Sequence, residues 1–212
     1  MSKYFARVVL VLTVLIVNFS AISLVQAMGS KGDDSKSLIV QQSYTWYDGD
    51  RERTVWLNSQ LVAEFNPHAE SRDILKEAYS SAEEVLSQRA SIRIWKMGNN
   101  VTAKSAIQNL KSSSVGSQYS PVLHDGASAS GGMRALPGNI IVHLNPSWDK
   151  SLVELWLKNN NLEVVRLLNI GPNILVIKSG AGLVSLDAAN KLYESGEVVA
   201  AYPDWWKEVV TK

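Results

Sequence analysis

The fold is decided by three apolar runs in the last third of the chain: NIIVHL (139–144), LEVVRLL (162–168) and ILVI (174–177). Branched and other apolar residues dominate each run, which is typical of buried strands. A fourth strand is predicted at 198–202, where Pro203 ends it.

Two helices are predicted between these strands. The first, 149–158, has Leu152, Leu155 and Trp156 on one face, and the second, 186–193, ends at Gly196. The resulting order is strand, helix, strand, strand, helix, strand. This is the split βαβ of ferredoxin-like domains, in which two helices cover one face of a single sheet. We therefore predict a ferredoxin-like βαββαβ domain at 133–212.

A separate N-terminal α+β region is predicted at 38–132. Aromatic and β-branched residues at 44–47 and 54–57 flank Asp48-Gly49-Asp50, which indicates a hairpin. The next elements are a short strand, a helix, a strand and a short helix, at 61–65, 71–88, 92–97 and 103–110. The predicted fold class is thus α+β: a β-hairpin and helix region followed by the ferredoxin-like domain.

The segment 111–132 is expected to be a loop that contains the domain boundary. It is rich in Ser and Gly, apart from a short apolar island at 119–124. Further along, Trp205 and Trp206 are adjacent, and neighbouring side chains of an extended segment point to opposite faces. The two indoles therefore cannot both enter one core.

The N-terminus has the pattern of a secretory signal peptide. Lys3 and Arg7 precede an apolar run at 8–17, and Val25-Gln26-Ala27 resembles a cleavage site. An uncleaved anchor is the alternative, although the run is short for a membrane span. We predict a signal peptide at 1–27, a flexible tether at 28–37, and a secreted, periplasmic or outer-surface bacterial protein without a membrane span after cleavage.

Composition argues against several functional classes. The chain has 21 Lys and Arg against 20 Asp and Glu, so a broad basic surface for nucleic acid is not expected. It has no cysteine, which excludes disulfides, thiolate nucleophiles and Cys-containing zinc sites. We find no GxSxG, GxGxxG or Walker A motif. The sequence predicts a protein that is not an enzyme.

The three histidines are His68, His124 and His143. His143 lies in a predicted strand and is interpreted as a partly buried structural residue. His68 and His124 are expected in loops beside ordered elements, where binding groups are common. The alternative interpretation is that His68 and His124 are ordinary surface residues with no binding role. Two converging imidazoles would instead suit copper, zinc or nickel.

The C-terminal half resembles the surface copper-binding proteins of methanotrophic bacteria. The residues that carry the resemblance are Met133–Val142, Leu144–Asp149, Ala188–Leu192 and Tyr202–Val209. Those proteins are exported and hold Cu(I) with two histidines, a water and a tryptophan oxidised to kynurenine. The resemblance implies His68 and His124 as Cu(I) ligands and a role in copper acquisition. The sequence departs from the family beside His68, where no tryptophan stands.

The segment 186–196, followed by a strand and a proline, also resembles the propeptide of subtilisin-type peptidases. The segment 44–51 resembles the N-terminal segment of such proteins in some bacteria. In that family the βαββαβ unit chaperones and inhibits the protease, and its C-terminal tail occupies the active-site groove. This resemblance implies a stand-alone inhibitor or folding chaperone with an exported partner protein, docking through 202–209. A structural envelope protein with neither property is the third interpretation.

Overall fold

The computed structural model describes residues 41–88, 91–113 and 116–209. These described residues belong to one structural unit. The predicted signal peptide and tether, at 1–27 and 28–37, lie outside the described residues. Among the helices of the described residues, none is long and apolar enough to cross a membrane.

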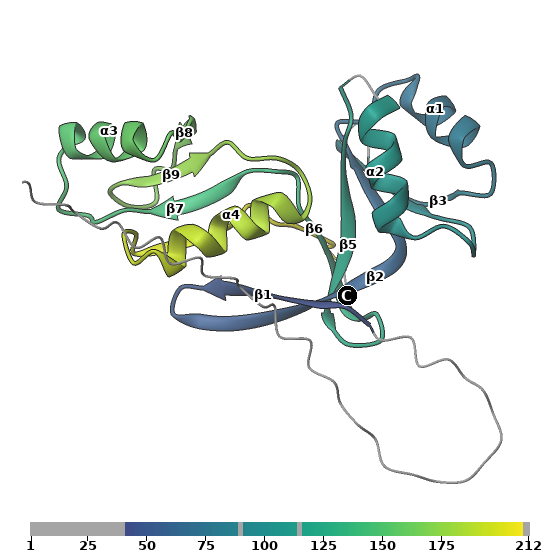
Figure 1. Cartoon of the computed structure of the whole chain (residues 1–212), viewed down its shortest axis with the longest axis horizontal. Helices are drawn as coiled ribbons and strands as arrows, with labels where there is room; N and C mark the ends of the chain where they lie inside the picture. Colours follow the sequence, from purple (N-terminus) through teal and green to yellow (C-terminus); the bar gives the residue numbers. More distant parts are fainter. Residues whose placement is uncertain (1–40, 89–90, 114–115, 210–212) are drawn as a thin grey trace, which may run out of the picture. The chain divides into compact units, whose positions relative to one another are not determined.

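A seven-stranded antiparallel sheet contains the strands of the N-terminal region (Figure 1). Its strands are β1 (Ser43–Asp48), β2 (Arg51–Phe65), β3 (Glu83–Gln88), β4 (Ile92–Lys96), β5 (Gln118–Gly126), β6 (Ser130–Ala135) and β11 (Trp206–Lys207). The order is β11-β6-β5-β2-β4-β3, and β1 pairs with β2 beside this path. The predicted hairpin at β1 and β2 is confirmed.

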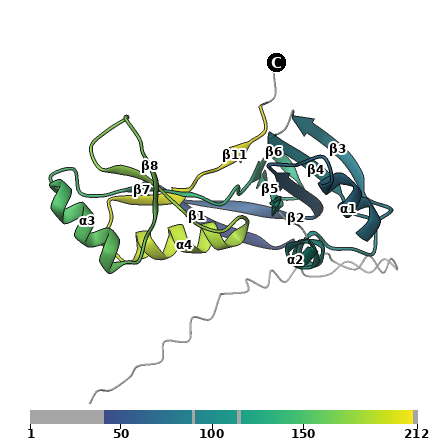
Figure 2. The same cartoon turned by 90° about the horizontal axis from the view of Figure 1, so that it is seen from above.

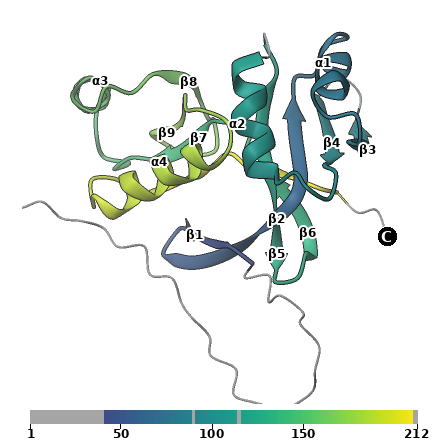
Figure 3. The same ribbon diagram turned by 45° about the vertical axis from the view of Figure 1, so that its right-hand side comes forward.

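Two helices, α1 (Ser71–Ala78) and α2 (Ala103–Ser113), pack on one face of this sheet (Figure 3). Leu75 of α1 and Leu110 of α2 share a core with Val62, Trp95 and Tyr119 of the strands. Phe65, Ile94, Val122 and the neighbouring Trp206 form a second core on the opposite face, as strand alternation requires.

A four-stranded antiparallel sheet contains the remaining strands, in the order β10-β7-β9-β8. Its elements, with their two helices, are β7 (Ile140–His143), α3 (Lys150–Asn159), β8 (Val164–Leu167), β9 (Ile174–Ile177), α4 (Leu183–Glu194) and β10 (Ala200–Pro203). Both helices contribute to one core, with Val153 and Trp156 from α3 and Ala189 from α4. They lie on the same side of β7 (Figure 2).

The β1–β2 hairpin packs against α4. Asn190 Nδ2 donates a hydrogen bond to the Thr45 carbonyl oxygen at 2.8 Å. The rings of Tyr47 and Tyr193 lie 4.3 Å apart between centroids. Trp46 and Leu186 also share a core. These contacts join elements that the sequence assigned to two regions.

The single helix predicted at 71–88 is wrong in its second half. The helix ends at Ala78, and Glu83–Gln88 form β3, which pairs with β4. The backbone leaves the helix at Tyr79, which has a φ of −141° and a ψ of 78°, and Ser80 and Ser81 form the turn that follows. Serine favours turns over the interior of a helix. Leu86 then pairs with Ile94 of β4, and this pairing favours a strand over a continued helix.

The strands predicted separately at 54–57 and 61–65 are one strand, β2. The pairing with β5 shifts register between Leu57 and Val62. Asn58 Oδ1 accepts hydrogen bonds from the backbone N–H groups of Gln60, at 3.0 Å, and Leu61, at 3.2 Å. The Asn58 side chain therefore accepts hydrogen bonds from two backbone N–H groups in the segment where the register with β5 shifts.

The loop predicted at 111–132 is wrong in most of its length. Residues up to Ser113 continue α2, and 118–126 form β5, a central strand between β2 and β6. The boundary predicted between 132 and 133 falls inside β6, Ser130–Ala135. The Ser/Gly-rich stretch is the tip of a hairpin, where Ser128 and Ala129 have positive φ.

Candidate functional site

His124 lies on β5 between two neighbouring strands. Its direct cross-strand partners are Trp56 on β2 and Met133 on β6. Directly paired residues of antiparallel strands point to the same face, so these three side chains form one row. His124 is 5% exposed, and its Nδ1 has no hydrogen-bond partner within the described residues. The loop predicted for this residue is a buried strand.

The tautomer of His124 follows from Asn58. The Asn58 Oδ1 accepts two backbone N–H groups, so its amide nitrogen faces His124 Nε2 at 3.2 Å. An amide nitrogen donates, and Nε2 of a neutral imidazole must therefore accept. This assignment leaves the proton on Nδ1, the atom without a partner.

His68 lies beyond the opposite end of β5. A Cβ atom placed on Gly116 would be 3.7 Å from two atoms of the His68 ring. His124 is six residues beyond Gln118, the first residue of β5, and six extended residues span about 20 Å. The structure therefore does not bring His68 and His124 together. Within the described residues, no group of three or more His, Asp or Glu side chains could hold a metal ion.

His143 lies in β7, with its Nε2 3.0 Å from the Tyr202 hydroxyl of β10. Burial lowers the pKa of His143. Burial, followed by the nearby Asp48 and Asp204 carboxylates, raises the pKa of Tyr202. Both shifts favour a neutral pair in which the phenol donates to the imidazole. The structural role predicted for His143 agrees with this contact.

Stability should therefore depend on the ionisation of His143. Its folded pKa lies below the unfolded value, so the unfolded chain takes up the proton first as pH falls. The stabilising contribution is complete above about pH 6.5 and is lost as pH falls below that value. The raised pKa of Asp204, caused mainly by burial, acts in the opposite sense at lower pH.

We expect His143→Gln to lose less stability than the wild type when pH is lowered from 7 to 5.5. Thermal unfolding of both proteins at the two pH values measures the difference. Parallel losses in the two proteins would show that His143 does not titrate on unfolding in this range.

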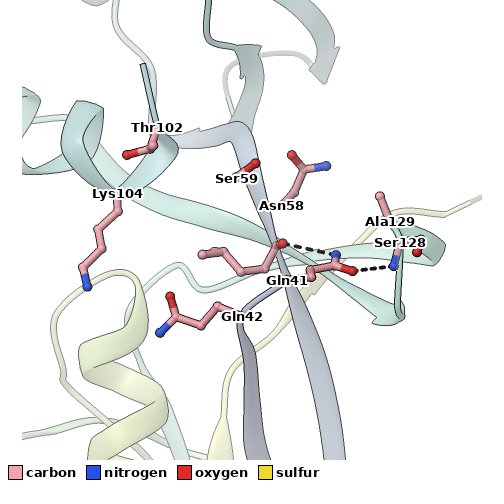
Figure 4. Close-up of a pocket in the computed structure, with 9 residues that line it drawn as sticks. Gln41, Gln42, Asn58, Ser59, Thr102, Lys104, Ser128 and Ala129 are labelled. Atoms are coloured by element: carbon pink, nitrogen blue, oxygen red, sulfur yellow. Dashed lines mark hydrogen bonds between the residues drawn. The ribbon is translucent and has the colours of Figure 1, made fainter. Parts of the chain in front are cut away.

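An open pocket of about 460 Å³ adjoins the His124 partner Asn58 (Figure 4). Most of its lining residues carry an amide or hydroxyl group, although more of the lining surface is apolar than polar: Gln41, Gln42, Leu57, Asn58, Ser59, Thr102, Lys104, Ser128 and Ala129. Gln41 bridges two walls, since its Nε2 donates to the Leu57 carbonyl oxygen and its Oε1 accepts from the Ser128 N–H. The lining offers binding groups but no imidazole or carboxylate for acid–base chemistry.

The C-terminal segment is held by the seven-stranded sheet. Trp206 and Lys207 pair with Ala135 and Arg134 of β6. The Trp205 ring packs edge-on against Trp46 at 5.4 Å, and the Arg134 guanidinium carbon lies 5.5 Å and 5.6 Å from the two ring centroids. Trp205 and Trp206 enter different cores, as predicted.

Sequence reasoning assigned no role in a site to Asn58, Met133 or Arg134. Each acts through a neighbour on another strand, and strand register cannot be read from local composition. In the sequence, only the adjacent Trp205 and Trp206 pointed to the region in which Arg134 packs.

Comparisons of the chain with protein-family models, curated proteins and solved structures find no match.

Proposed function

We propose that the protein binds a subtilisin-type serine protease, as a stand-alone inhibitor or folding chaperone. The observation that carries the proposal is the antiparallel order β10-β7-β9-β8 with α3 and α4 on one face. That order, with the element sequence βαββαβ, supports a ferredoxin-like unit of the kind that the propeptide resemblance implies.

The face of this sheet opposite the helices is the proposed contact surface. Ile140 and Leu175 belong to the helix-side core, so the alternate residues Ile141 and Val176, which pair directly, point the other way. Ile141 is partly exposed on this face, whereas Val176 is 1% exposed and is covered by its neighbours. Arg166 pairs with Val176 on the same face and is exposed. The His143–Tyr202 pair adds polar groups. The partly exposed Ile141, the exposed Arg166 and the polar pair give this face the mixed character that protein interfaces commonly have.

The C-terminal segment is already paired with β6, so it enters a protease groove only after β11 separates from that strand. The Glu208 N–H also donates to the Met133 carbonyl oxygen at 3.0 Å. We therefore assign first contact to the sheet face and not to the tail.

The test is inhibition of purified subtilisin by the purified protein, measured with a chromogenic peptide substrate. We expect activity to fall to a plateau as the protein reaches molar equivalence, and denatured subtilisin to refold in higher yield in its presence. An unrelated protein of equal size is the control, because any cleavable protein competes with the substrate. Unchanged activity across several secreted subtilisin-type enzymes would contradict the proposal.

Cu(I) binding is a second candidate function, favoured by the pairing of His124 with Met133. Imidazole and thioether are both ligands that copper accepts, and thioether sulfur selects Cu(I). Copper would bind His124 through Nδ1, the ring nitrogen without a partner within the described residues, and the proton on Nδ1 would then have to leave that atom, which requires the Asn58 contact at Nε2 to change. This site uses His124 without His68, unlike the pair that the copper-protein resemblance implies.

A Cu(I) competition titration separates these alternatives. We expect His124→Ala and Met133→Leu to lose binding and His68→Ala to keep it. Affinity should also fall at low pH, because protons compete with the metal for the imidazole. Binding that survives His124→Ala would rule out this site.

A further inference from the structure

A second open pocket, of about 740 Å³, lies at the end of α3 beside β10. It is lined by Asn145, Trp148, Trp156, Asn159, Asn160, Gly196, Glu197, Val198 and Val199. The volume falls in the range of small-molecule sites. It contains none of the residues assigned to protease or copper binding.

The carboxylate of Glu197 is fixed at the pocket wall. Its Oε2 accepts from Trp156 Nε1 at 2.9 Å and from Asn160 Nδ2 at 3.4 Å. Asn160 Nδ2 also donates to the Trp156 carbonyl oxygen at 3.0 Å. These bonds hold the Glu197 and Asn160 side chains, while Glu197 Oε1 and Asn160 Oδ1 keep their acceptor capacity.

Two other lining residues, Asn145 and Asn159, supply donors. Asn145 Oδ1 accepts from the backbone N–H and the hydroxyl of Ser147, at 3.0 Å and 2.7 Å. Its amide nitrogen therefore faces away from Ser147 and has no partner within the described residues. Asn159 is exposed and offers both a donor and an acceptor. The pocket thus presents donors and acceptors together.

The donors, acceptors and charge of the pocket lining favour one class of ligand. The lining has a carboxylate and no Lys or Arg, which disfavours anions. A cation needs acceptors alone and would leave the amide donors unused. A hydroxyl both donates and accepts, and the half-buried Trp148 offers an apolar indole surface for the C–H face of a sugar ring. We propose that this pocket binds a neutral saccharide of one or two rings.

The proposal is tested by titrating the full protein with cellobiose, maltose and N,N′-diacetylchitobiose, using tryptophan fluorescence and calorimetry. We expect saturable binding of at least one disaccharide. Asn159→Ala should weaken it about fivefold, the effect of one lost hydrogen bond. Asn99→Ala is the matched control, since Asn99 is exposed and lines a different pocket.

A second variant separates a sugar from a cation. Glu197→Gln keeps an acceptor but removes the charge, so saccharide affinity should change by less than threefold. Three outcomes would overturn the proposal: no saturable binding of any of the three sugars, equal loss in Asn159→Ala and Asn99→Ala, or binding of N-acetyl-lysine amide that Glu197→Gln abolishes. Thermal unfolding of each variant shows whether a loss of saccharide affinity comes from misfolding.

Discussion

Trp95→Ala is expected to lower the free energy of unfolding by about 5 kcal/mol. Trp95 is fully buried among Val62, Leu75 and Tyr119, and removal of such a ring costs about 3–5 kcal/mol through lost burial and the remaining cavity. Its Nε1 also donates to Glu64 Oε2 at 2.9 Å, and Glu64 is fully buried. Loss of that donor leaves a buried carboxylate with one partner fewer, which adds about 1–3 kcal/mol.

Urea unfolding followed by circular dichroism measures this loss, with Trp95→Phe as the matched control. Phenylalanine keeps most of the ring but not the donor, so we expect a loss of about 2–3 kcal/mol. Ser117 Oγ still donates to Glu64 at 3.1 Å in both variants. Equal stability of Trp95→Ala and wild type would mean that this core does not support the fold.

Gly138→Ala is expected to cost about 3–4 kcal/mol. Gly138 has a φ of 125°, a conformation that residues with a Cβ rarely adopt. A Cβ atom there would lie 2.9 Å from Ala181 N and 3.1 Å from Gly180 C. Both are backbone atoms, so the clash cannot be relieved by rotation of a side chain.

Gly196→Ala is the control for this prediction. Gly196 has a φ of 72°, and nothing lies within 4 Å of an added Cβ. That substitution therefore carries only the left-handed backbone cost, about 1–2 kcal/mol. Chemical denaturation of the two variants should separate them by about 2 kcal/mol, and equal losses would show that the turn at Gly138 relaxes.

The elements of the four-stranded sheet could be predicted because each has a local signal. Val176 and its neighbours form an unbroken apolar run, and Asp149 accepts from the Leu152 N–H at 2.9 Å as the N-cap of α3. The segment 79–88 had no such signal. Its apolar spacing fits a helix, but the deciding partner, Ile94, lies on β4. Tertiary pairing of this kind overrides local periodicity.

The candidate site was predictable only in part. His124 could be selected because few histidines exist, whereas its neighbours Met133 and Asn58 follow from strand register and a bulge. The separation of His68 from His124 likewise depends on the length of β5. The number of histidines in a sequence says nothing about the distances between them. Only the fold could therefore show whether His68 and His124 lie close together.

The central claim is tested most directly by calorimetric titration of active-site-inactivated subtilisin with the full protein and two charge-reversed variants. Arg166→Glu changes the proposed contact face, whereas Lys150→Glu makes the same change of charge at an exposed position on α3, on the helix side. We predict saturable binding of the wild type, an affinity for Lys150→Glu within twofold of it, and at least tenfold weaker binding of Arg166→Glu. No measurable binding of the wild type, or equal weakening by both variants, would contradict the account.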